Sequence, residues 1–234
     1  MGADSALGVL SAGAGGPAVV ATLQRLLPHE DLLVLSDAAY APYARRPAHV
    51  VADRVGRLAI ELQGLGVKAI ALASAAATSD ALAAAAARVA VPVVGLEALV
   101  PAGVRGPVAF VVGAGSLRGL PLARTLRAPR GVSLVVDAWP GLDSAGGAAQ
   151  VAERVASLRA RGVTTLVLAD EQASAVRAAV EAAAGDLPVH DAAETLARRM
   201  QALLRTNGLL ARRRRAGRLQ LMSSHPTRDA WFAP

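Results

Sequence analysis

The chain has 234 residues, enough for one large domain or two small ones, and its 53% hydrophobic and 18% charged residues exclude global disorder. Aromatic residues make up only 3%, so the core must be built from alanine, valine and leucine. There is no cysteine, which excludes disulfides, thiolate metal sites and a cysteine nucleophile.

The formal net charge is +7, and nearly all of the positive charge comes from arginine. A GC-rich genome also produces such a composition, so the charge is weak evidence for nucleic-acid binding. The N-terminus has no basic segment before its first apolar run, and no apolar stretch is long enough to cross a bilayer. We therefore expect a cytoplasmic protein without a signal peptide or membrane contact.

The first part of the chain alternates short apolar runs with segments of helical periodicity. Glycine-rich or small-residue turns follow the first and third apolar runs, and the third run is expected to lead into a helix that begins near residue 78. We expect strands at 6–10, 31–35, 67–73 and 91–94, and helices at 17–27, 49–64 and 80–89.

The second part repeats this alternation, which predicts parallel sheets covered by helices on both faces. An apolar run at 219–222 is predicted to return to the first sheet as a last strand. The predicted division is a first α/β domain at 1–96 plus 205–234 and a second at 97–204. We expect strands at 108–112, 133–136, 164–168 and 187–189, and helices at 148–161, 175–184 and 191–204.

Five stretches carry the most informative pattern. They read LSAGAGG at 10–16, SDAAYAPYA at 36–44, VKAIALASAAAT at 67–78, TLVLADEQAS at 165–174 and VHDAAETLARR at 189–199. In this order they resemble the motifs of glutamate racemase, within the aspartate/glutamate racemase superfamily. The resemblance implies two flavodoxin-like α/β domains facing each other across a cleft that holds D- or L-glutamate. It also implies racemisation with no cofactor, in which one cysteine thiolate removes the α-proton and a second thiol returns one.

Carried over by position, the catalytic residues of the family are missing. Ser74 and Asp170 stand where the two cysteines are expected. An unassisted serine hydroxyl is almost never ionised at neutral pH, and no histidine lies near Ser74 in the sequence. Each positioned acid or base contributes roughly 10²–10⁴-fold to a rate, so the sequence predicts that two-thiol racemisation is lost.

Five positions remain as candidates for substrate binding: Ser11, Pro42, Tyr43, Thr78 and Glu171. Ser11 opens a glycine-rich turn, which suits either an anion at a helix start or simply a tight turn. Asp170 and Glu171 are open to two interpretations: a new acid/base pair in the old cleft, or a cap on the next helix. No histidine accompanies them, so we expect no metal site.

Two functions are consistent with these residues. The first is a non-catalytic relative that acts by binding or regulating a partner chain. The second is an isomerase or one-base lyase that uses Asp170 or Glu171 on an acidic or altered substrate. For an active enzyme, the resemblance would imply D-glutamate supply for peptidoglycan.

The run Arg212, Arg213, Arg214 and Arg215 is the remaining feature. It is expected to be either a solvated linker or a contact for an acidic partner or nucleic acid, although the aromatic residues typical of a nucleic-acid surface are missing. Some glutamate racemases bind DNA gyrase and homodimers are common in the family, so the resemblance allows a protein partner or a second copy of the chain.

Overall fold

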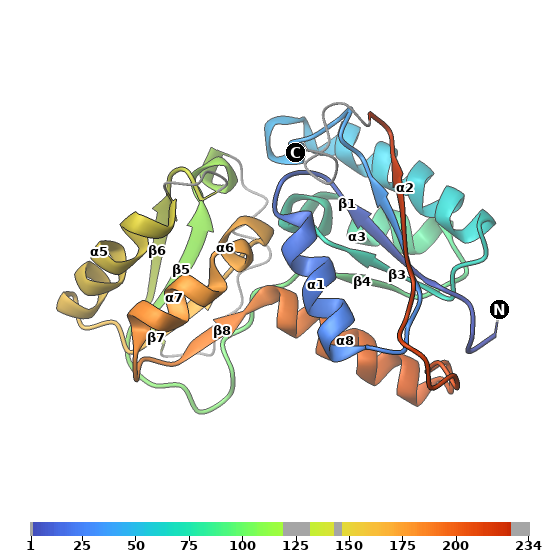
Figure 1. Ribbon diagram of the computed structural model, residues 1–234. Coiled ribbons are helices and arrows are strands. Elements are labelled where there is room, and N and C mark those ends of the chain that lie inside the picture. The colour runs from blue at the N-terminus through green and yellow to red at the C-terminus, as the bar shows by residue number, and fades with distance from the viewer. Residues whose placement is uncertain (1, 119–131, 143–146, 226–234) are drawn as a thin grey trace.

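A computed structural model describes residues 2–118, 132–142 and 147–225 of the chain. Its strands form two separate parallel sheets, which confirms the predicted fold class (Figure 1). No helix within these ranges is long and apolar enough to span a bilayer.

The first sheet has five strands in the order β4-β3-β1-β2-β9. Its inner strands β1, β2 and β3 are apolar and fully buried because helices cover both faces, as expected of a parallel sheet, whereas the edge strand β9 is largely exposed. The predicted return of the C-terminal segment is confirmed, since β9 pairs in parallel with β2 at the edge of this sheet (Figure 1). The strand bounds are β1 Leu7–Ser11, β2 Leu32–Ser36, β3 Ala69–Leu72, β4 Val93–Gly95 and β9 Leu219–Ser223.

The second sheet has four strands in the order β6-β5-β7-β8, again all parallel. The helices α5 and α7 cover one of its faces, where they share a core with β5 and β7. The strand bounds are β5 Val108–Gly113, β6 Leu134–Trp139, β7 Thr165–Leu168 and β8 Val189–Asp191.

The helices α2 and α3 cover one face of the first sheet, and α1 and α8 cover the other. The core around α1 and α8 also contains Val108, Phe110 and Val112 of the second sheet, so apolar packing joins the two halves. The helix bounds are α1 Gly16–Leu26, α2 Ala48–Gly64, α3 Ala75–Arg88, α5 Gly147–Ala160, α6 Glu171–Ala175, α7 Arg177–Ala184 and α8 Ala192–Thr206, with short 3₁₀ helices η1 Tyr43–Arg45 and η2 Ala114–Arg118.

Two predicted helices differ from the observed ones. The helix expected to begin near residue 78 begins at Ala75, because the Ser74 side chain caps it. The helix expected at 175–184 starts at Arg177, and a separate short helix, α6, precedes it. The predicted division into 1–96 plus 205–234 and 97–204 stays a proposal, and residues 226–234 of that tail lie outside the described residues.

Candidate functional site

A cavity of about 590 Å³ lies where the carboxyl ends of strands from both sheets approach each other. In α/β sheets this is the edge at which ligands bind, because the loops there face outward from the strand ends. The first sheet contributes the turn after β1, the loop with η1, and the start of α3, and the second sheet contributes η2 and the start of α6. The cavity wall is therefore made by both halves of the molecule.

Ser74 lines this cavity at the end of β3. Its backbone is extended and its hydroxyl accepts a hydrogen bond from the Ala77 N–H at 3.4 Å, which makes it the N-cap of α3. The residue is 1% exposed. The side chain at the first cysteine position thus has a structural role in starting a helix.

Asp170 occupies the matching place at the end of β7, but its carboxylate turns into the second half of the molecule. One oxygen accepts from the Ala173 N–H at 2.8 Å and caps α6. The other accepts from the Gly113 N–H at 2.8 Å and from the Ser116 hydroxyl. Complete burial raises the pKa of Asp170 although these hydrogen bonds oppose the rise. Asp170 is not among the residues that line the cavity.

Glu171, the next residue, does line the cavity and reaches across it. Its Oε2 accepts a hydrogen bond of 2.9 Å from the Ala75 N–H, at the first turn of α3 in the other half. Burial, and then the nearby Asp170 carboxylate, raise the pKa of Glu171 to about 7, against the hydrogen bonds from Ala75 and Ser74. Of the two neighbouring acids, Glu171 is the one placed to meet a ligand.

The predicted substrate-binding residues divide into two groups. Pro42, Tyr43 and Glu171 line the cavity. Ser11 and Thr78 do not: Ser11 is fully buried at the end of β1, and the Thr78 hydroxyl donates to the Ser74 carbonyl oxygen at 2.9 Å. The structure brings only the first group to the same cavity as Ser74.

The sequence reasoning missed a buried network beside the cavity. The Asp37 carboxylate accepts two hydrogen bonds from the Arg54 guanidinium, at 2.7 and 2.9 Å, and one from the Tyr43 hydroxyl at 2.7 Å. Burial favours the neutral acid, but the hydrogen bonds from Arg54, Tyr43 and Ser224 outweigh it and hold the pKa of Asp37 below its usual range. Asp37 and Arg54 are 17 positions apart, so no local spacing signal reveals this pairing.

The same network determines what Tyr43 can do. Burial and the Asp37 charge raise the pKa of Tyr43 far above its usual range, so the phenol stays neutral. Its hydroxyl hydrogen is donated to Asp37, which leaves the ring as the part that shapes the cavity. Tyr43 therefore forms part of the cavity wall and does not act as a base.

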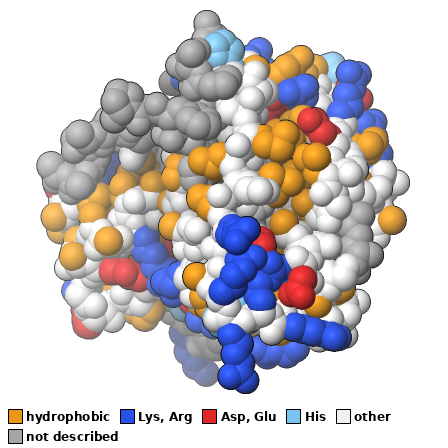
Figure 2. Space-filling model, turned by 45° about the vertical axis from the view of Figure 1, so that its right-hand side comes forward, with side chains coloured by type: hydrophobic (Ala, Val, Ile, Leu, Met, Phe, Trp, Pro, Cys, Tyr) orange, Lys and Arg blue, Asp and Glu red, His pale blue; other side chains and the backbone are white. Residues whose placement is uncertain are grey.

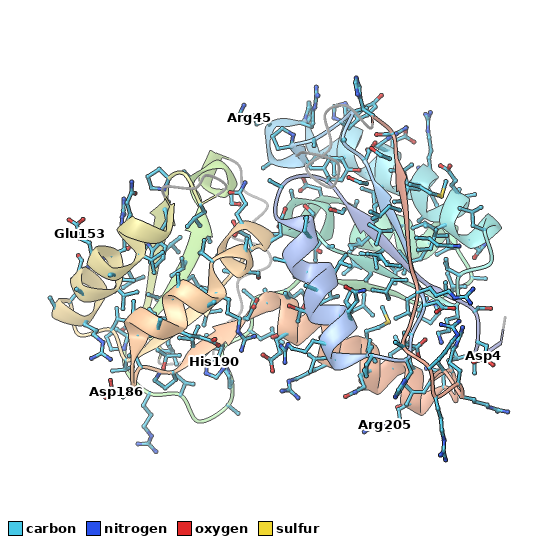
Figure 3. The ribbon with its side chains drawn as sticks, viewed as in Figure 1. Asp4, Arg45, Glu153, Asp186, His190 and Arg205 are labelled. Carbon is cyan, nitrogen blue, oxygen red and sulfur yellow. The ribbon has the colours of Figure 1, made fainter. Side chains whose placement is uncertain are left out.

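Two arginines of the loop after β2 are also part of the lining, and the sequence reasoning did not single them out. Arg45 and Arg46 are exposed, and Arg45 points outward from the molecule in Figure 3. In the described ranges no cluster of three histidine, aspartate or glutamate side chains is arranged to hold a metal ion. The cavity thus combines a cationic rim with one internal carboxyl group.

Comparison with known proteins gives a consistent result, although no family model matches the chain. It is 32% identical over 221 residues to glutamate racemase of Pseudomonas putida, covering 88% of this chain and 83% of that protein. It is 38% identical over 125 residues to glutamate racemase of Deinococcus radiodurans, but this match covers only 43% of that protein.

Among solved structures, a glutamate racemase isoform of Bacillus anthracis matches with a TM-score of 0.76 over 94% of this chain and 89% of that one. The sequence identity in this match is 21%, so it supports the fold alone. The 32% identity with the Pseudomonas putida protein extends over most of both chains, so this match supports membership of the family as well as the fold. The chain belongs to the glutamate racemase family, as a member without cysteine.

Proposed function

We propose that this protein is a non-catalytic member of the glutamate racemase family, which keeps the cavity between the two halves as a binding site. The proposal rests on the structural roles of the residues that stand at the two cysteine positions. Ser74 caps α3 and Asp170 is buried in three hydrogen bonds within its own half. Neither side chain is a thiol, and neither is free to take a proton from a bound amino acid.

The test is deuterium incorporation at the α-carbon of L- and D-glutamate in deuterated buffer, followed by proton NMR. This assay detects removal of the proton from one face as well as full racemisation. We expect no incorporation above the buffer background, with the Pseudomonas putida relative as the positive control. Incorporation at the rate of that control would contradict the proposal.

A second candidate function rests on Glu171. A carboxyl group that lines a cavity and has a pKa of about 7 has the properties of a general base near neutral pH. The alternative is therefore an isomerase or one-base lyase that uses Glu171 on a changed substrate, and Asp170 would have no part in it. If the wild type exchanges the α-proton of any amino acid and Glu171→Gln does not, this alternative replaces the first; D-glutamate supply for peptidoglycan would be its role if that amino acid is glutamate.

A binding protein also needs a partner, and the arginine run is the candidate surface for an acidic chain. Half of the run is already engaged: Arg215 donates to the Asp31 carboxylate at 2.8 and 2.9 Å, and Arg213 pairs with the same group. Arg212 and Arg214 are exposed. Figure 2 shows a face of the molecule on which basic side chains gather with a few acidic ones. The proposal of a partner contact is thus limited to Arg212 and Arg214.

The partner contact is tested by binding the protein to an immobilised acidic peptide and measuring the salt concentration at which it elutes. Arg212→Ala/Arg214→Ala is expected to elute at lower salt than the wild type, because each removed contact lowers the salt dependence. The matched control is Arg57→Ala/Arg161→Ala, which removes two exposed arginines from elsewhere on the molecule. Equal elution of the two double variants would contradict the assignment.

A further inference from the structure

The start of α3 is the most polar part of the cavity wall. The first backbone N–H groups of a helix have no partner inside the helix, and they carry partial positive charge. In α3, Ser74 satisfies only the Ala77 N–H, through a long hydrogen bond of 3.4 Å. The Ala75 N–H points at a group from the other half of the molecule, the Glu171 carboxylate.

The Glu171 backbone is fixed by contacts on two sides, and this places its carboxylate at the start of α3. On one side, Asp170 caps α6 and so holds the residue that directly precedes Glu171. On the other side, α1 begins against it: a Cβ added to Gly15 would lie 2.5 Å from the carbonyl carbon and oxygen of Glu171. Only glycine permits this approach, because any larger residue would push the two halves apart. The carboxylate is therefore pre-positioned, with little conformational freedom left to lose on contact.

We propose that Glu171 is the built-in carboxylate of the cavity: it occupies the anion-binding start of α3, ties the two halves together there, and excludes external carboxylates. The inference rests on the proposed function, in which the cavity binds ligands without racemising them. In this proposal Glu171 determines which ligands the cavity can bind. A free carboxylate must displace Glu171 from the Ala75 N–H, which costs free energy. Above pH 7, where Glu171 is ionised, the external carboxylate must also lie beside its negative charge, which costs more.

The experiment removes the internal carboxylate and supplies one from solution. We expect Glu171→Ala to unfold at a lower temperature than the wild type and to be stabilised by sodium acetate beyond the effect of equal sodium chloride. At ten times the dissociation constant of acetate, the ratio of folded to unfolded protein rises about tenfold. The wild type is expected to show no difference between acetate and chloride, because its site is filled.

Two further variants keep the test decisive. Glu171→Gln retains an oxygen that can accept from the Ala75 N–H, so it is expected to fold and to have the same melting temperature in acetate as in chloride. Glu153→Ala removes an exposed glutamate of α5, which points into solvent in Figure 3, and should behave as the wild type does. If Glu171→Ala does not fold, acetate is titrated against the ¹⁵N-labelled wild type and Glu171→Gln. The Ala75 amide resonance is then expected to differ between these two proteins and not to move with acetate in either.

The results that overturn the proposal are specific. An acetate response in the wild type as large as in Glu171→Ala would show that Glu171 does not fill the site. No acetate response in a folded Glu171→Ala, or an Ala75 resonance unchanged by Glu171→Gln, would show that the contact has no such role. Neither result depends on catalysis, so the deuterium exchange assay fails or succeeds independently.

Discussion

Replacing Asp170 tests whether its carboxylate stabilises the fold or is a catalytic group. In Asp170→Ala the cap of α6 is lost, at about 0.5–2 kcal/mol. The buried Gly113 N–H, which donates to Asp170 at 2.8 Å, loses this acceptor, at about 1–3 kcal/mol. Ser116 is only half-buried, so water replaces its partner at little cost. The expected loss is about 1.5–5 kcal/mol of the free energy of unfolding.

Asp170→Asn distinguishes the individual hydrogen bonds. Its amide oxygen can still cap α6, but the amide nitrogen then faces the Gly113 N–H, so donor meets donor. We expect this variant to lose about 1–3 kcal/mol, less than the alanine variant, because the α6 cap remains and the Gly113 bond is broken, while the Ser116 hydroxyl can turn to accept from the amide nitrogen. The order wild type, asparagine, alanine follows directly from the three observed bonds.

Urea unfolding followed by tryptophan fluorescence measures these losses. Trp139 is buried in the same half as Asp170, and a Trp231→Phe background removes the second tryptophan from the signal. Glu153→Gln, a surface change, is the control and should stay within about 0.5 kcal/mol of the background protein. An Asp170→Ala variant as stable as that control would refute the structural role and return Asp170 to the list of candidate catalytic groups.

Three further predictions concern buried charge and the cavity. Lys68→Met, which leaves its buried partner Glu30 unpaired, should lose about 3–5 kcal/mol in urea unfolding, and adding Glu30→Met should recover much of it; equal losses would contradict this. Because folding raises the pKa of Glu171 from 4.5 to about 7, its protonated form stabilises the native state at low pH. The melting temperature of the wild type relative to Glu171→Gln should therefore fall as pH rises from 4.5 through 7, and a rise would refute the direction. Ser74→Cys should not restore racemisation of glutamate, because Asp170, at the second cysteine position, is buried and does not line the cavity; formation of D-glutamate from L-glutamate would disprove that.

The sequence determined the architecture well, and particular elements show why. Short apolar runs ended by glycine or small residues predicted the strands, since a strand buried on both faces needs little else. Even the run at 219–222, far from its neighbours in sequence, was placed correctly in the first sheet. The motif order identified the family, and Ser74, Pro42, Tyr43 and Glu171 line one cavity in the structure.

Tertiary structure decided which of two adjacent acids meets the cavity. The sequence gives Asp170 and Glu171 similar chemistry, but Asp170 has extended backbone as a cap and Glu171 is the first residue of α6, so their side chains point in different directions. Long-range pairs such as Asp37 with Arg54, and Lys68 with Glu30, were likewise invisible in the sequence. Local patterns specify strands and caps, whereas the partner of a buried charge depends on which distant segments the fold brings within hydrogen-bonding distance.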